Sequence, residues 1–171
     1  YRAKELGGNT YEFYAEEIGA HAEKRLLLEN ELRRALDNDE FVLYYQPQVD
    51  ITGHRTCGFE ALIRWRRPER GMVPPADFIG ILEETGMIVE VGEWVLQTAT
   101  RQLAEWRRQG REDLTMAVNL SSHQFERSGL QESLERLLEE RGLKPEMLEL
   151  EVTEGTLMQD VASTTRTLQE L

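Results

Sequence analysis

The fold of this chain is decided by residues 56–65, which read TCGFEALIRW. The run is mainly apolar, with aromatic and branched side chains typical of a buried strand, and it is interrupted by Glu60 and Arg64. Side chains of a strand alternate between its two faces, so these two residues, four positions apart, point to the same face. The stretch therefore predicts a strand that presents a carboxylate and a guanidinium together in an otherwise apolar sheet.

Helical and extended patterns alternate regularly around this strand. The expected elements are, in order, a helix over 20–36, a strand over 41–49, a turn at 52–54, the strand 56–65, a loop over 66–75, a short helix over 76–84, a long helix over 88–107, a strand over 114–120, a helix from Leu130 to Gly142, a strand over 147–152 and a last helix from Leu157. Alternation of helix and strand predicts parallel strands joined by crossover helices.

Two α/β architectures fit this order, a doubly wound sheet and an α/β barrel. No glycine-rich phosphate loop follows a strand, which disfavours the doubly wound nucleotide-binding fold. An eight-stranded barrel takes about 250 residues. Because the 171 residues supply about four strands with their helices, we expect roughly the first half of a (β/α)8 barrel.

Composition limits the classes of function. The chain is 40% hydrophobic and 30% charged, which is typical of a packed domain. Its formal charge of -12 opposes binding to a nucleic-acid polymer, so a small anionic ligand would need local cations or metal ions. The single Cys57 excludes an internal disulfide, and three scattered histidines predict no zinc site. With no long apolar run or leader pattern, we expect a cytoplasmic domain.

Polar residues near the ends of three expected strands are the first candidates for chemistry. Glu60, Asn119 and Glu151 each interrupt an apolar run on a different strand. Active sites of α/β barrels lie at the carboxyl ends of the strands, and oxygen donors of this kind suit Mg²⁺ or Mn²⁺. For any one of them alone, a structural bond to a loop or to an arginine is the better interpretation. For all three on consecutive parallel strands, a metal site is favoured.

Two further residues could bind a ligand. Arg64 could hold a phosphate through two hydrogen bonds, although a salt bridge to Glu60 or Glu151 is equally compatible with the spacing. Gln46 could face a ligand from the first strand, although a simple edge-strand kink at Pro47 is the better interpretation from the residues alone.

The remaining aromatic and histidine side chains favour structural roles. Trp65, Trp94 and Trp106 are predicted to pack in the core or on the surface and not to stack on a nucleotide base. His123 follows two serines and could act as an acid or base, but a capping loop is the favoured interpretation.

The motifs then match a known family. The string EALIRW at 60–65 resembles the signature of EAL domains, the bacterial phosphodiesterases of cyclic di-GMP. Further blocks are similar to the family in order and spacing, namely YYQPQV at 44–49, PADFI at 75–79 with EETG at 83–86, NLS at 119–121 and LELEVTE at 148–154. Residues 1–14 resemble the closing helix and strand of a GGDEF (diguanylate cyclase) domain. We therefore expect a GGDEF-like tail and linker over 1–19 and the N-terminal part of an EAL domain over 20–171.

The resemblance implies a modified TIM barrel that hydrolyses cyclic di-GMP to linear pGpG with two Mg²⁺ or Mn²⁺ ions. By motif match, Glu60, Asn119 and Glu151 take the places of metal ligands, with Glu60 as a catalytic residue. Arg64 takes the place of a phosphate-binding arginine, and Gln46 that of a glutamine that contacts the substrate. The resemblance also implies a homodimer through the EAL domain and a GGDEF domain in cis.

The sequence departs from the family pattern after the LELEVTE block. The family continues with an Asp-Asp-Phe-Gly block, a lysine and later Glu and Gln residues of the site, and none of these motifs occurs up to Leu171. Alone, the 171 residues are therefore expected to be inactive and to leave a sheet edge that further strands must close. Two alternatives stay open: an inactive EAL domain that is a receptor for cyclic di-GMP or a protein partner, and a barrel hydrolase for another phosphoester.

Overall fold

The structure is a computed structural model that describes residues 16–68, 70–125 and 129–152. The helix end and strand expected within 1–14, and the last helix expected from Leu157, lie outside these residues. Among the described residues, no helix is both long and apolar enough to cross a membrane.

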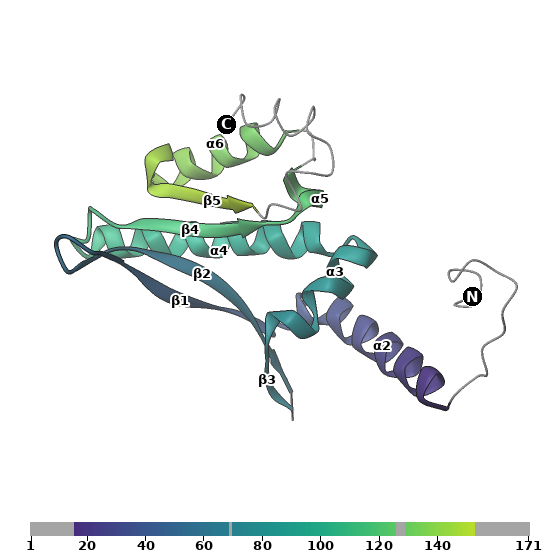
Figure 1. The fold of residues 1–171 in the computed structure, drawn as a ribbon. Helices are drawn as coiled ribbons and strands as arrows, with labels where there is room; N and C mark the ends of the chain where they lie inside the picture. The colour runs from purple at the N-terminus through teal and green to yellow at the C-terminus, as the bar shows by residue number, and fades with distance from the viewer. Residues whose placement is uncertain (1–15, 69, 126–128, 153–171) are drawn as a thin grey trace, which may run out of the picture.

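A mixed sheet forms the centre of the fold (Figure 1). Its strands are β1 (Phe41–Asp50), β2 (Arg55–Arg67), β3 (Gly71–Val73), β4 (Thr115–Leu120) and β5 (Leu148–Val152). The order is β1-β2-β4-β5, with β1 antiparallel to β2 and the pairs β2–β4 and β4–β5 parallel. The expected parallel strands joined by crossover helices are therefore present from β2 onward.

One expected loop is partly wrong. Residues 66–75 were expected to be irregular because of their prolines and glycines, yet β2 continues to Arg67 and β3 folds back on it. Trp65 pairs with Val73 in an antiparallel register, and Gly71 adopts a φ of 78° that suits a glycine at the turn. The glycine and proline residues thus mark the turn of a hairpin, and the short Met72–Val73 run after it is too brief to be recognised as a strand by pattern.

The helices follow the predicted order, with one short helix added at 122–125, where only a capping loop was expected. They are α2 (Glu16–Ala35), α3 (Ile79–Thr85), α4 (Ile88–Arg108), α5 (Ser122–Phe125) and α6 (Leu130–Arg141), with 3-10 turns at Pro75–Asp77 and Pro145–Met147. Figure 1 shows α4 running along β4, with β5 and α6 beyond it. The expected helix over 76–84 is divided into a 3-10 turn and α3, which Gly86 ends in the left-handed conformation.

The larger core lies between one face of the sheet and the helices α4 and α6. The apolar stripe predicted on the long helix is confirmed, since Val95, Ala99 and Leu103 are buried against Met116 and Val118 of β4. At roughly 25 cal/mol per Å² of apolar area removed from water, this layer supplies the main driving force for holding α4 on the sheet. Helix α6 adds Leu134 and Leu138 to the same cluster.

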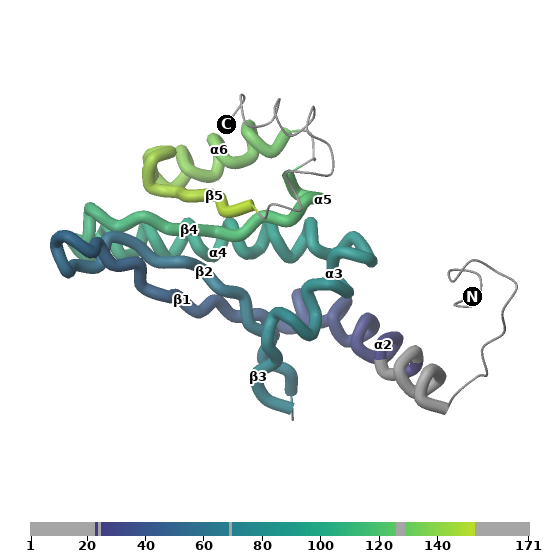
Figure 2. Tube along the Cα trace, in the orientation of Figure 1, coloured from purple at the N-terminus to yellow at the C-terminus, as the bar shows by residue number. Residues whose placement is uncertain are grey.

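A second core holds α2 against the far end of β2. The predicted buried face of this helix is confirmed, with Leu32 and Ala35 fully buried beside Trp65 and Phe78. The path of α2 away from the sheet is visible in the tube view (Figure 2). Trp65 is also fixed by a 3.0 Å hydrogen bond from its Nε1 to the Glu40 carboxylate, which supports the packing role predicted for it.

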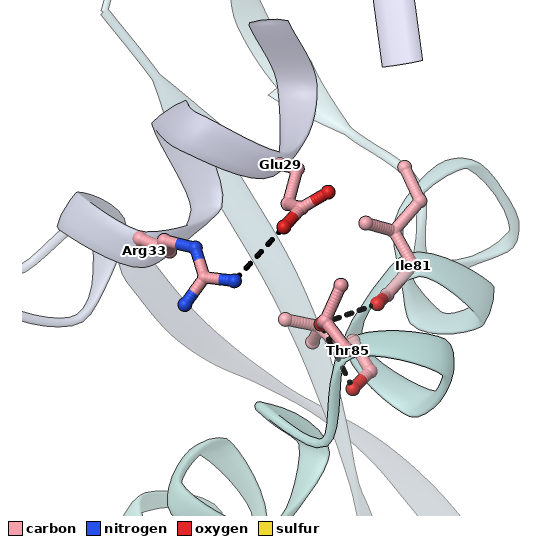
Figure 3. A network of polar contacts seen from close by, with 5 residues as sticks. Glu29, Arg33, Ile81 and Thr85 are labelled. Atoms are coloured by element: carbon pink, nitrogen blue, oxygen red, sulfur yellow. Dashed lines mark hydrogen bonds and ion pairs between the residues drawn. The ribbon is translucent and has the colours of Figure 1, made fainter. Parts of the chain in front are cut away.

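Ion pairs at the edges of this second core tie α2 to its neighbours. Arg25 of α2 pairs with Glu84 of α3, and Glu31 pairs with Arg67 of β2. The hydrogen bond from Arg67 lowers the pKa of the Glu31 carboxyl. Figure 3 shows the exposed Glu29–Arg33 pair within α2 close to Thr85 of α3, whose hydroxyl donates to the Ile81 carbonyl oxygen at 2.6 Å. The helix that leads into the domain is thus docked on it by apolar and ionic contacts.

Candidate functional site

The candidate residues lie on the sheet face opposite to the helix-covered core. Along β4, Val118 is 1% exposed and faces α4, whereas its neighbour Asn119 is exposed on the other face. Along β2, Ala61 belongs to the core and Glu60 faces away from it. The period of two in each strand therefore separates the apolar residues from the candidate ligands.

The parallel register brings three of these residues together. The Asn119 side-chain amide donates from Nδ2 to Oε1 of Glu60 at 2.8 Å, across the β2–β4 boundary. Asn119 is also the register partner of Glu151 on β5. The sequence prediction that Glu60, Asn119 and Glu151 stand on consecutive parallel strands is confirmed, and their role as ligands stays a prediction.

One detail of their placement differs from the prediction. Asn119 and Glu151 lie one residue before the ends of β4 and β5, as expected, but Glu60 lies within β2. The pairing of β2 with β4 ends at Ala61, directly after Glu60, and β2 continues to Arg67 because β1 and β3 still pair with it. Glu60 is thus at the end of the parallel-paired segment and not at the end of the strand.

Electrostatics on this face favour a bound cation. Burial raises the pKa of the Glu151 carboxyl, and the negative charges of Glu60 and Glu149 raise it further. Glu149 was not singled out from the sequence, although the alternation in Leu148-Glu149-Leu150-Glu151 places it on the same face as Glu151. A divalent cation would relieve the repulsion between these carboxylates.

The donor set fits a hard metal ion. In the part of the chain that the structure describes, no group of three or more His, Cys, Asp or Glu side chains is placed to hold a metal. A site here would therefore need the amide oxygen of Asn119 beside the carboxylates of Glu60 and Glu151. Two carboxylates and an amide are all oxygen donors, which suit Mg²⁺ or Mn²⁺ better than zinc.

Arg64 and Gln46 flank this group on β2 and β1. Gln46 is exposed and is the register partner of Glu60 in the antiparallel β1–β2 pair. Arg64 donates from Nη1 to the carbonyl oxygen of Ile63 at 2.8 Å, and its Cζ lies 5.7 Å from the ring centroid of Tyr44. Among residues 16–68, 70–125 and 129–152, no ion pair joins Arg64 to Glu60 or Glu151.

The contacts of Arg64 bear on whether it is free to bind a phosphate or is held in a salt bridge to Glu60 or Glu151. A salt bridge would have left the guanidinium occupied by a carboxylate, and the contacts found are instead a carbonyl oxygen and an aromatic face. Tyr44, which is 52% exposed, was not recognised as part of this surface. The antiparallel register, which pairs Tyr44 with Leu62 on the face of Glu60, could have indicated it.

Comparison with known proteins gives a consistent family. Residues 29–171 match the model of the EAL domain. The chain is 42% identical over 171 residues, all of its length, to the bifunctional diguanylate cyclase/cyclic di-GMP phosphodiesterase MucR of Pseudomonas aeruginosa, and 38% identical over 160 residues, 94% of its length, to the cyclic di-GMP phosphodiesterase PdeR of Escherichia coli. It spans 25% and 24% of these two relatives.

Solved structures agree with this family. The MucR phosphodiesterase in complex with c-di-GMP matches with a TM-score of 0.80 and 42% identity, over 84% of this chain and 58% of that one. The Xanthomonas citri FimX EAL domain in complex with c-diGMP matches with a TM-score of 0.76 and 26% identity, over 88% of this chain and 58% of that one. The predicted α/β fold is thereby confirmed, and the chain belongs to the EAL domain family.

Proposed function

We propose that the complete protein hydrolyses cyclic di-GMP to linear pGpG as a metal-dependent phosphodiesterase. The observation that carries the proposal is the contact between Asn119 and Glu60 beside Glu151, on three consecutive parallel strands. The names of MucR and PdeR, and the c-di-GMP bound in the MucR structure, support the substrate class.

In this proposal, Glu60, Asn119 and Glu151 hold two Mg²⁺ or Mn²⁺ ions together with groups outside these 171 residues. When bound, such ions lower the pKa of a bound water and stabilise the charge that develops on a phosphodiester. Glu60 and Glu151 supply the negative charge that retains them, and Asn119 supplies a neutral oxygen. The amide of Asn119 also orients the Glu60 carboxylate through the bond at Oε1.

Arg64 and Gln46 bind the substrate in this proposal. The strongly acidic chain repels a phosphodiester anion, so binding of that anion needs a fixed cation beside the carboxylates. The Arg64 guanidinium, which no carboxylate among the described residues occupies, can donate to phosphate oxygens. The exposed amide of Gln46, opposite Glu60 on β1, can bind the polar part of the ligand.

We also propose that residues 1–19 are the end of a GGDEF-like domain with its linker, followed by the EAL domain. The alignment with MucR, named as a bifunctional diguanylate cyclase and phosphodiesterase, supports this because it covers all 171 residues. A cytoplasmic location and a homodimer through the EAL domain remain predictions. Light scattering of the complete protein would test the dimer.

The decisive experiment measures pGpG formation by the complete protein. Turnover is expected with Mg²⁺ or Mn²⁺, to disappear in EDTA, and to be abolished by Glu60→Ala with the melting temperature retained. Glu132→Ala on the exposed surface of α6 is the matched control and should keep full activity. Turnover in EDTA, or by Glu60→Ala, would contradict the proposal. Binding of cyclic di-GMP without turnover would favour the receptor alternative.

Arg64→Ala tests the second half of the proposal. Cyclic di-GMP binding should weaken by about 1.5 to 3 kcal/mol, as expected for one charge-assisted contact, while Mn²⁺ binding changes little. Calorimetric titration of each ligand separates the two effects. Unchanged affinity for cyclic di-GMP would make Arg64 a structural residue.

A further inference from the structure

The segment that follows Asn119 is closed by a reciprocal set of hydrogen bonds. Ser121 donates from its backbone N–H and from its hydroxyl to Oε1 of Gln124, at 3.3 and 3.2 Å. The backbone N–H of Gln124 in turn donates to Oγ of Ser121 at 3.4 Å. This is a capping box, and it starts α5 directly after β4 ends at Leu120. It agrees with the capping loop predicted around His123.

The Gln124 side chain also packs against the long helix α4. Its side chain is 5% exposed, and a Cβ atom built at Gly92 would overlap the Nε2, Cδ and Oε1 atoms of its amide. Gly92 lies within α4 and is not among the glycines with positive φ, so the backbone there does not require a glycine. A glycine inside a helix is less favourable than alanine. The feature of the structure that calls for glycine at this position is the space taken by Gln124.

The packing of Gln124 on Gly92 matters because α5 is too short to be stable without tertiary contacts. A helix of four residues has almost no internal stability, so its position depends on the side chains it buries. Phe125 enters the main core at 2% exposed, and Gln124 rests on α4. Together they fix the direction in which the chain leaves β4, two residues after Asn119.

We propose that Gln124, which packs on Gly92, is a positioning residue that keeps Asn119 in place to contact Glu60 and to bind the metal ion. The proposal rests on the metal-binding function proposed above for Asn119. Gln124 does not touch the ligand group; it acts through Ser121 and the backbone that joins it to Asn119. Residues that orient a metal ligand from outside the coordination shell alter metal affinity when they are replaced.

The first test uses Gln124→Met in the complete protein, because methionine keeps the volume and removes the acceptor for Ser121. The dissociation constant for Mn²⁺, measured by calorimetry, should rise about 10-fold. The matched control is Gln97→Met, the same change at an exposed position of α4, and its affinity should equal that of the wild type. Gln124→Glu retains an oxygen acceptor and a capping box, so it should recover most of the lost affinity.

A second pair of variants tests the contact between Gln124 and Gly92. Gly92→Ala should weaken Mn²⁺ binding as Gln124→Met does, because its methyl group displaces the Gln124 amide. Gly80→Ala in α3, where a Cβ would have no neighbour within 4 Å, is the matched control and should have no effect. In the double variant Gly92→Ala/Gln124→Ala the clash is absent, so it should bind Mn²⁺ no more weakly than Gln124→Ala alone.

Hydrogen exchange in the absence of metal separates this proposal from the proposed function. The Ser121 amide, bonded to Oε1 of Gln124, should exchange faster in Gln124→Met than in Gln97→Met. A wild-type protein that binds no Mn²⁺ would refute the function of the site whatever the exchange shows. Wild-type Mn²⁺ affinity in a folded Gln124→Met protein would overturn the positioning role. If Gln124→Met does not fold, Gly92→Ala carries the same test.

Discussion

The two faces of the β2–β4–β5 sheet differ in burial and in charge, although their residues alternate along the same strands. Val118 and Ala61 are nearly inaccessible to solvent in the core with α4, and their sequence neighbours, Asn119 and Glu60, meet on the opposite, open face through a 2.8 Å hydrogen bond. On the covered face, energy comes from the removal of apolar surface from water. On the opposite, open face, burial raises the pKa of the Glu151 carboxyl, and repulsion from the carboxylates of Glu60 and Glu149 raises it further. One face thus stabilises the fold, while the other bears a cost that a cation would remove.

The difference between the two faces is tested most directly by placing the same side chain on both. Val118→Asp should destabilise the protein by about 4 kcal/mol or more, because an unpaired charge is buried in the core. Asn119→Asp, one residue later, should cost only about 1 to 2 kcal/mol, because its carboxylate stays in solvent although it loses the hydrogen bond to Glu60 and repels that carboxylate. Urea denaturation of the complete protein measures both. Similar losses in the two variants would show that the open face is as tightly packed as the covered one.

The two arginines of β2 also differ, because Arg64 lies on the open face, whereas Arg67 forms an ion pair with Glu31 of α2. Glu31→Gln should lower the free energy of unfolding by about 1 kcal/mol, because it leaves the largely buried Arg67 unpaired. The pKa of Glu31 is lowered in the folded protein, so this contribution is present above the ordinary Glu pKa and is lost as the pH falls through the lowered value.

Urea denaturation at neutral pH and near pH 3 checks this sign. The matched control is Glu29→Gln, which removes an exposed pair with Arg33 within α2 and should cost no more than about 0.5 kcal/mol. Equal effects of the two variants would mean that Arg67 gains nothing from its position under α2. Cyclic di-GMP affinity should be unchanged in both, since neither residue lies on the open face.

The smallest effect is expected at Glu151. Glu151→Gln should raise the stability of the metal-free protein at neutral pH, by less than about 1 kcal/mol since the charges are partly exposed. A raised carboxyl pKa means that the penalty is absent below the ordinary Glu pKa and complete once the pH exceeds the folded value. The gain should therefore disappear near pH 3. Melting in EDTA at both pH values measures it, and a loss of stability at neutral pH would contradict the electrostatic picture.

Much of the fold follows from local patterns. The stripe on α4, the buried face of α2 and the strands around Glu60, Asn119 and Glu151 were predictable because apolar periodicity reports which face of an element is buried. The β3 hairpin was missed because three residues are too few to show a period. The role of Gln124 was missed because the residues around it in the sequence do not indicate that it packs on Gly92 of α4.

By itself, the sequence determined the order of the elements, the alternation that separates apolar from polar faces, and the EALIRW motif that places a carboxylate and a guanidinium on one face. These are properties of neighbouring residues, set by backbone geometry. Only the tertiary structure decided that Asn119 meets Glu60, 59 positions away, that the Arg64 guanidinium lies over the Tyr44 ring, and that Gln124 rests on Gly92. Such contacts depend on strand register and on how helices pack, and no local pattern encodes the distance between residues that only folding brings together.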